Sequence, residues 1–284
     1  HVEAGVLSLV AKLYPNIFSN LDSYCIKYKD FINGTIFVFS HEVQFYIAYI
    51  EYMEKFKWAG LHFCYPQING HSKEERNLEG FDLALAGKLI VQNQPVVCND
   101  FYLKGEERII VVSGPNQGGK TTFARVFGQL HHLASLGCPV AGKEAKLFLF
   151  DRIFTHFERE ENIKNLSGKL QDDLIRMNEI LNHATTGSII IINEILSSTT
   201  LKDAIAIGKK IMEEIVRLDS LCVFVTFLDE LSTYSKKNVS MVSTVVPEDP
   251  ARRTYKIIRS PANGLAYAIH IAEKYRLTYD CLKE

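Results

Sequence analysis

The sequence lacks an excess of charge of either sign. Its 32 basic and 33 acidic side chains give a formal net charge of −1 over 284 residues. A chain-wide basic surface of the kind that attracts nucleic acid is therefore excluded, and a DNA-binding surface would have to be local or lie outside this chain. Residues 236–238 (KKN) and the pair Arg252 and Arg253 are too few cations to form a groove, which indicates a solvated surface.

Long apolar runs are missing as well. No stretch approaches the ~18 apolar residues of a membrane-spanning helix, and no signal peptide opens the chain. The six cysteines include no Cys-x-x-Cys pair and have no histidine at metal-ligand spacing. These absences indicate reduced thiols in a cytoplasmic protein with no membrane partner. Because the chain begins at His1, we expect it to be a fragment of a longer protein.

The chain does contain enough apolar residues for a sizeable core, because 47% of its residues are hydrophobic. In residues 40–58, Ser40 stands at an N-cap position, and apolar residues recur near helical spacing at Val43, Ile47, Ile50 and Met53. This pattern predicts a core helix that packs on more than one side. Residues 66–80 are rich in turn formers, which indicates a connecting loop that carries His71 as a surface histidine. We therefore expect a helical connector region at 1–80 and a second domain at 81–284.

The second domain alternates short apolar strands with helices. Strands are expected at 108–114, 146–151, 188–193 and 221–227, and helices at 119–136, 169–184 and 203–217. This alternation is typical of an α/β fold whose mostly parallel sheet is covered on both faces. Residues 241–246 and 253–258 resemble an antiparallel edge, and residues 266–277 a closing helix.

A glycine-rich loop joins the first strand to the first helix. Residues 113–127 read SGPNQGGKTTFARVF and fit the pattern G-x-x-x-x-G-K-[ST]. Glycines let a backbone wrap around a phosphate, and the helix that follows adds the positive end of its dipole. Lys120 would supply charge for the β- and γ-phosphates and Thr121 a hydroxyl for Mg²⁺. This phosphate-loop NTPase pattern predicts an ATP site formed by Gly114, Pro115, Asn116, Gln117, Gly118, Gly119, Lys120, Thr121 and Thr122.

A second candidate group follows the strand SIIIIN (188–193). In phosphate-loop ATPases, a strand beside the first ends in an acid that holds Mg²⁺ through water, and a following Glu polarises the attacking water. Glu194 is therefore the candidate general base. Asn193 stands where the acid is expected, and its amide oxygen can accept a hydrogen bond from a magnesium-bound water but carries no charge. This difference predicts weaker Mg²⁺ binding or slower turnover, with nucleotide binding retained.

The loop GPNQGGKTTF resembles GPNMGGKST of the MutS mismatch-repair ATPases, and Pro115 and Asn116 narrow the match. The similarity continues in order through residues 135–162, 165–181, 192–204 and 225–231. The resemblance places Ser167 where the family's serine reaches the γ-phosphate bound by a partner subunit. It implies a MutS- or ABC-like fold, a homodimer with composite ATP sites, and DNA contacts mainly through regions outside this chain.

Several positions depart from the family pattern, which indicates a divergent branch. Asn193 replaces an Asp, Phe227 replaces a His near the γ-phosphate, and residues 196–198 (LSS) replace Gly-Arg-Gly. One interpretation is a slow MutS-like ATPase in which Glu194, Lys120 and Ser167 are catalytic and Thr121 and Asn193 hold the metal. The alternative is a nucleotide-responsive dimerisation clamp with negligible hydrolysis and no mismatch-repair role. A different, ABC-type ATPase is disfavoured because LSGKL (166–170) matches LSGGQ only in part.

Overall fold

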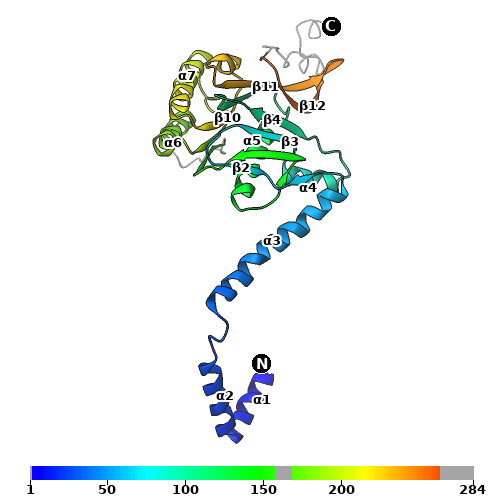
Figure 1. The fold of residues 1–284 in the computed structure, drawn as a ribbon, viewed down its shortest axis with the longest axis vertical. Coiled ribbons are helices and arrows are strands. Elements are labelled where there is room, and N and C mark those ends of the chain that lie inside the picture. The colour runs from blue at the N-terminus through cyan, green and yellow to red at the C-terminus, as the bar shows by residue number, and fades with distance from the viewer. Residues whose placement is uncertain (1, 158–167, 263–284) are drawn as a thin grey trace. The chain divides into compact units, whose positions relative to one another are not determined.

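The computed structural model describes residues 2–157 and 168–262 (Figure 1). The chain divides into two compact units after Glu54. Helices α1 (Val2–Leu13) and α2 (Pro15–Lys27) belong to the first unit, and the long helix α3 (Gly34–Trp58) begins there. Two expected features, the closing helix at 266–277 and Ser167, lie outside the described residues.

Helix α3 differs from the expected core helix that begins at Ser40. It begins at Gly34, and the Ser40 hydroxyl donates to a main-chain oxygen inside the helix at 2.8 Å instead of capping it. Met53 is buried, whereas Ile47 and Ile50 are exposed, so the expectation of packing on several sides is wrong. Helical periodicity identifies a face that could be buried, but it does not supply the partner that covers it.

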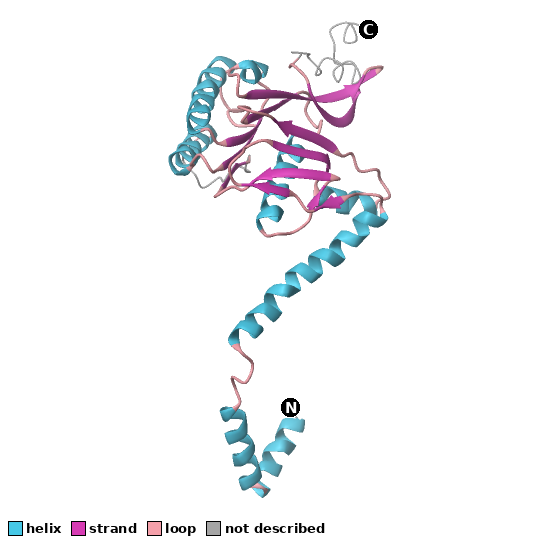
Figure 2. Cartoon of the chain, viewed as in Figure 1, coloured by secondary structure: helices cyan, strands magenta, loops and turns pink. Residues whose placement is uncertain are grey.

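The second unit, whose strands are magenta in Figure 2, is built on a six-stranded sheet. The strand order in this sheet is β12–β11–β5–β10–β9–β8. The strands are β5 (Ile109–Ser113), β8 (Ile153–His156), β9 (Ile189–Asn193), β10 (Leu221–Val225), β11 (Asn238–Val246) and β12 (Asp249–Arg259). Strands β11, β5, β10, β9 and β8 run parallel, and β12 pairs antiparallel with β11 at the edge. The predicted α/β fold and its antiparallel edge are confirmed.

Strand β9, which ends in Asn193, does not lie beside β5 as expected. Strand β10 lies between them, and its Val223 pairs with Ile110 of β5 on one side and Ile191 of β9 on the other. A crossover connection can skip a position in a parallel sheet, so sequence order does not fix spatial order. The carboxyl ends of the three parallel strands still meet at one edge, which is where α/β proteins bind ligands.

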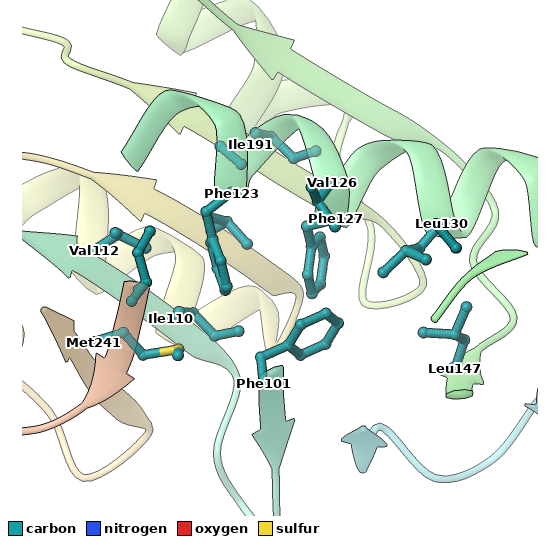
Figure 3. Close-up of a cluster of buried hydrophobic side chains, with 14 of the residues drawn as sticks. Phe101, Ile110, Val112, Phe123, Val126, Phe127, Leu130, Leu147, Ile191 and Met241 are labelled. Carbon is teal, nitrogen blue, oxygen red and sulfur yellow. The ribbon is translucent and has the colours of Figure 1, made fainter. Parts of the chain in front are cut away.

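Helices cover both faces of this sheet. Helix α5 (Lys120–Ser135) packs on the face that carries Ile110 and Val112, and helices α6 (Lys169–His183) and α7 (Leu201–Leu218) pack on the face that carries Ile109 and Val111. All three helices were predicted from the sequence. Figure 3 shows the buried cluster on the α5 side, where Phe123 and Phe127 of α5 lie against Phe101, with ring centroids 5.9 and 5.2 Å from it.

A second, four-stranded sheet packs into the α5-side core. Its order is β2 (Gln67–Asn69), β7 (Glu144–Phe148), β3 (Glu75–Gly80) and β4 (Asn99–Leu103). The remaining elements are the strand pair β1 (Phe63–Cys64) and β6 (Val140–Ala141), helix α4 (Leu83–Val91) and the 3₁₀ helix η1 (Asp229–Thr233).

This sheet overturns two expectations. Residues 66–80 contain strands β2 and β3 and are not merely a loop, although the turn with exposed His71 remains between them. The strand expected at 146–151 is β7 of this sheet, and the parallel sheet instead uses β8, which follows directly. In both cases the strands pair with partners distant in sequence, which local composition does not reveal. Glu75 and Asn77 of β3 are polar although they are buried, so the composition of this segment did not indicate a strand.

Among the described residues, no helix combines the length and the hydropathy needed to cross a bilayer.

Candidate functional site

The glycine-rich loop joins the end of β5 to the start of α5, as its sequence predicts. Gly114 has a φ of 113°, in the left-handed region that favours glycine. A Cβ on Gly118 would lie 2.1 Å from the Ser243 hydroxyl oxygen and 2.9 Å from the main-chain oxygen of Pro115. Glycine is therefore required at 114 for conformation and at 118 for close approach. Pro115 is buried, whereas Asn116 and Gln117 are exposed on the loop.

The side chain of Lys120 lies inside this loop and is only 3% exposed. Its ammonium donates to the main-chain oxygens of Gly114 at 3.0 Å and Pro115 at 3.1 Å, and to Asn116 Oδ1 at 3.4 Å. Burial lowers the pKa of Lys120, and the neighbouring Glu194 carboxylate opposes that change. The loop thus holds a buried ammonium at the positive end of α5.

Glu194 and Asn193 stand at the carboxyl end of β9. The main-chain N–H of Glu194 donates to Val225 O at 3.0 Å, and the residue has a φ of 54°, which is uncommon for a residue other than glycine. In this conformation Glu194 Oε1 lies 3.5 Å from the Lys120 ammonium. The structure therefore brings two of the predicted site residues together, Lys120 at the start of α5 and Glu194 after β9.

Asn193 fits a role beside a hydrated metal. Its side chain is buried, and its Oδ1 has no hydrogen-bond partner within the part of the chain that the structure describes. A buried, unpaired amide oxygen at a strand end can accept a hydrogen bond from a metal-bound water. Thr121, in the first turn of α5, offers a half-buried hydroxyl as a direct ligand, and Thr122 follows it. Hard oxygen donors of this kind suit Mg²⁺.

A cluster of the usual metal-binding side chains is absent from the described ranges 2–157 and 168–262. No group of three or more His, Cys, Asp or Glu side chains gathers there in a way that could hold an ion by itself. In nucleotide sites, Mg²⁺ usually takes oxygen donors from the substrate phosphates and from water as well as from the protein.

Two further residues touch the loop and were not recognised from the sequence. The Ser243 hydroxyl donates to Gly118 O at 2.7 Å, and Arg253 Nε donates to Asn116 O at 3.1 Å. The sequence indicated Arg253 only as a surface cation, but it is half-buried, whereas Arg252 is exposed. Both contacts come from the β11–β12 hairpin, which lies more than a hundred residues away in sequence, so no local signal could have revealed them.

Comparison with known proteins identifies a family that includes ATPases of the kind that the site indicates. A family model described as MutS domain V matches residues 110–283. The DNA mismatch repair protein MutS of Thermotoga maritima is 30% identical over 187 residues, which cover 63% of this chain and 23% of that protein. The corresponding protein of Chlorobium phaeovibrioides is 31% identical over 221 residues, covering 74% of this chain and 24% of that protein. The Endonuclease MutS2 of Gemmatimonas aurantiaca is 29% identical over 192 residues, or 66% of this chain and 23% of that protein.

The chain spans about a quarter of the length of these relatives. The match to the family model begins within β5, before the glycine-rich loop, and includes β8, β9 and the β11–β12 hairpin. The residues that form the hydrogen bonds and the ion pair of Lys120 described above, Gly114, Pro115, Asn116 and Glu194, lie inside this match. The chain belongs to the MutS family, and its residues 110–283 correspond to MutS domain V.

Proposed function

We propose that this chain is an ATP-binding and slowly ATP-hydrolysing domain of a MutS-like protein. The observation that carries the proposal is the Lys120 ammonium, buried within a loop of the phosphate-binding pattern and 3.5 Å from the Glu194 carboxylate. A buried cation in a glycine-rich loop at a helix N-terminus favours a polyphosphate ligand. The fold we infer is that of a phosphate-loop NTPase.

Each residue then has a defined role. Residues 114–122 bind the phosphates through inward main-chain N–H groups and the Lys120 charge. Thr121 holds the magnesium ion directly and Asn193 through water, and the ion when bound neutralises charge on the phosphate oxygens. Glu194 accepts a proton from the attacking water and orients it. Because Asn193 is uncharged, we expect slow turnover.

Residues outside this site complete the proposal. By analogy with the family, the chain acts as a homodimer in which Ser167 contributes to the partner's site. Two of the similar proteins are named for DNA mismatch repair, so we propose a DNA-related role for the whole protein, through regions outside this chain. A cytoplasmic location stays a prediction from composition.

A second candidate function is a nucleotide-responsive dimerisation clamp with negligible hydrolysis. Two observations favour it. Asn193 supplies no carboxylate for the metal, and Phe227, just beyond the end of β10, exposes 49% of its surface and offers no hydrogen bond to a phosphate. An exposed aromatic ring at this edge suits contact with another protein surface better than phosphate chemistry.

The experiment that tests ATP binding is titration of the protein with a fluorescent ATP analogue in the presence of Mg²⁺. Wild type should bind, and Lys120→Ala should weaken binding by at least about a hundredfold, because a buried charge–phosphate contact is lost. The matched control is Lys202→Ala, which removes an exposed lysine at the start of α7 and should bind as wild type. Equal binding by Lys120→Ala and wild type would overturn the proposal.

A further inference from the structure

The β11–β12 hairpin is irregular where it passes the phosphate loop. Ser243 pairs with Ile257 and Val245 pairs with Arg253, so the step from 243 to 245 on β11 is matched by the longer step from 257 to 253 on β12. Within the extra residues, Tyr255 has a φ of 60°. Bulges of this kind redirect side chains and are frequent next to functional sites, and a large residue with positive φ is strained.

The irregular segment contacts the outside of the loop at several points. Arg253 Nε donates to Asn116 O at 3.1 Å, and Ser243 Oγ donates to Gly118 O at 2.7 Å. A Cβ added to Gly119 would lie 3.7 Å from the main-chain oxygen of Tyr255, so the backbone of the bulge also packs against the end of the loop.

These contacts bear on how the loop binds a ligand. A loop that turns its N–H groups inward toward phosphates turns some carbonyl oxygens outward, and donors that hold those oxygens fix the direction of the N–H groups. The carbonyl oxygens of Gly114 and Pro115 accept from Lys120 within the loop, whereas those of Asn116 and Gly118 accept from Arg253 and Ser243 of the hairpin. Arg253 donates with a charged group, which makes the hydrogen bond stronger than a neutral one.

The charge of Arg253 also reaches the interior of the loop. Arg253 and Lys120 both contact Asn116: Arg253 Nε donates to its main-chain oxygen at 3.1 Å, and Lys120 Nζ donates to its Oδ1 at 3.4 Å. Two like charges this close repel each other, and a polyanion bound beside them relieves that repulsion. The resulting gain in binding free energy is larger for a ligand that carries more negative charge.

We propose that Arg253 is a positioning residue of the phosphate site, which fixes the Asn116 carbonyl outward and adds a second positive charge beside Lys120, so that the site favours a nucleoside triphosphate over the diphosphate. The inference rests on the proposed function, because it concerns the same loop. Arg253 belongs to β12 and lies outside both the glycine-rich loop and the end of β9, so neither sequence pattern includes it.

The experiment compares Arg253→Gln, Arg253→Lys and the adjacent Arg252→Gln, which removes the same charge from an exposed position. Kd values for Mg-ATP and Mg-ADP are measured by titration with fluorescent analogues at two salt concentrations. Arg253→Gln should weaken ATP binding about tenfold and ADP binding about threefold, and should reduce the salt dependence of ATP binding. Arg253→Lys should recover part of the ATP affinity, because the charge remains. Arg252→Gln should stay within about twofold of wild type.

A second readout needs no nucleotide. Hydrogen exchange of the amides of residues 116–119 should be faster in Arg253→Gln than in Arg252→Gln, because the loop has lost an anchor. If Arg253→Gln matches Arg252→Gln in both exchange and the ratio of ATP to ADP affinity, the inference is wrong. If wild type itself binds neither nucleotide, the proposed function fails and so does the preference for a triphosphate. In that case the exchange data still decide whether Arg253 positions the loop.

Discussion

The ammonium of Lys120 lies 3.5 Å from a carboxylate oxygen of Glu194, although strand β10 separates the two strands that lead to these residues. Glu194 follows the end of β9 with a φ of 54°, and from there its carboxylate reaches past the end of β10 to the Lys120 ammonium. A phosphate bound at the loop would compete with Glu194 for the same ammonium. The pair therefore couples phosphate binding to the position of the candidate base.

That competition predicts the behaviour of Glu194→Gln. The amide keeps the size of the side chain but removes a negative charge that repels the phosphates and holds Lys120. ATP should bind to this variant about threefold more tightly than to wild type, because the site has lost a negative charge that repels the phosphates. Equilibrium titration with Mg-ATP measures this. Glu213→Gln, at an exposed position on α7, is the matched control and should leave the Kd unchanged. Weaker ATP binding by Glu194→Gln would contradict the proposed competition.

Asn193→Asp should increase the affinity for Mg²⁺. The substitution adds a carboxylate where the buried amide oxygen has no partner in the described part of the chain, and a charged oxygen holds a hydrated dication better than an amide does. We expect half-maximal ATP hydrolysis at about tenfold lower Mg²⁺ concentration. Without Mg²⁺ the variant should be less stable than wild type, because its buried carboxylate lies next to Glu194. An unchanged Mg²⁺ dependence would remove Asn193 from the metal site.

Local signals were sufficient for part of this architecture. The loop from Gly114 to Lys120, strands β5, β9 and β10, and helices α5, α6 and α7 were predicted, because each depends on a short-range pattern: glycine spacing, apolar runs or helical periodicity. The phosphate-loop ATPase pattern singled out Asn193 as a departure, and the structure adds that its Oδ1 has no hydrogen-bond partner among the described residues.

The parts that could not be predicted depend on pairing between distant segments. Strand β3 carries buried Glu75 and Asn77, so its composition resembles a loop, and only its pairing with β4 and β7 makes it a strand. The position of β10 between β5 and β9 is a property of the crossover connections. The contact of Arg253 with Asn116 joins positions 137 residues apart. None of these three pairings can be inferred from the residues next to it in the sequence.

An ion cluster at the opposite end of β5 gives a prediction about acid stability. Asp219 ends helix α7 in a left-handed conformation and accepts hydrogen bonds from Lys237 at 2.5 Å, Arg108 at 3.2 Å and Lys73 at 3.2 Å. Burial alone would raise the pKa of Asp219, but these hydrogen bonds outweigh it and lower the pKa to about 2. The stabilisation should therefore be complete above pH 4 and be lost as the pH falls toward 2.

Asp219→Asn tests this account, because asparagine tolerates the left-handed conformation but carries no charge. We expect a loss of about 2 kcal/mol in the free energy of unfolding at pH 7, since three cations lose their shared anion. Urea denaturation at pH 7 and near pH 2 measures the difference, which should shrink at the lower pH. A difference that is the same at both pH values would show that charge is not the cause.

A buried pair between α5 and β3 predicts a pH dependence of the opposite sign. His131 Nε2 and Glu75 Oε1 are 2.7 Å apart, and both side chains are fully buried. Burial alone would lower the pKa of His131, but Glu75 and the main-chain oxygen of Phe127 outweigh it and raise the pKa above 6.5. The stability from this pair is present below that ordinary value and is lost as the pH rises through the raised pKa.

Glu75→Gln should remove this pH dependence. Its free energy of unfolding should be lower than that of wild type by about 3 kcal/mol at pH 6, because a buried cation loses its partner, and the gap should narrow at higher pH. Urea denaturation between pH 6 and 9 measures both slopes. His132→Gln, at the exposed neighbour of His131, should keep the wild-type slope. A parallel profile for Glu75→Gln and wild type would contradict the charged pair.

The most direct test of the proposed ATPase is the steady-state Mg-ATPase rate per subunit at rising protein concentration, for wild type and Glu194→Gln. The account predicts a slow rate that increases with concentration, because each site needs a partner subunit, and that vanishes in Glu194→Gln. A rate that Glu194→Gln leaves unimpaired would contradict the role of Glu194 as base. Absence of turnover at every concentration, with ATP still bound, would favour the clamp over the enzyme.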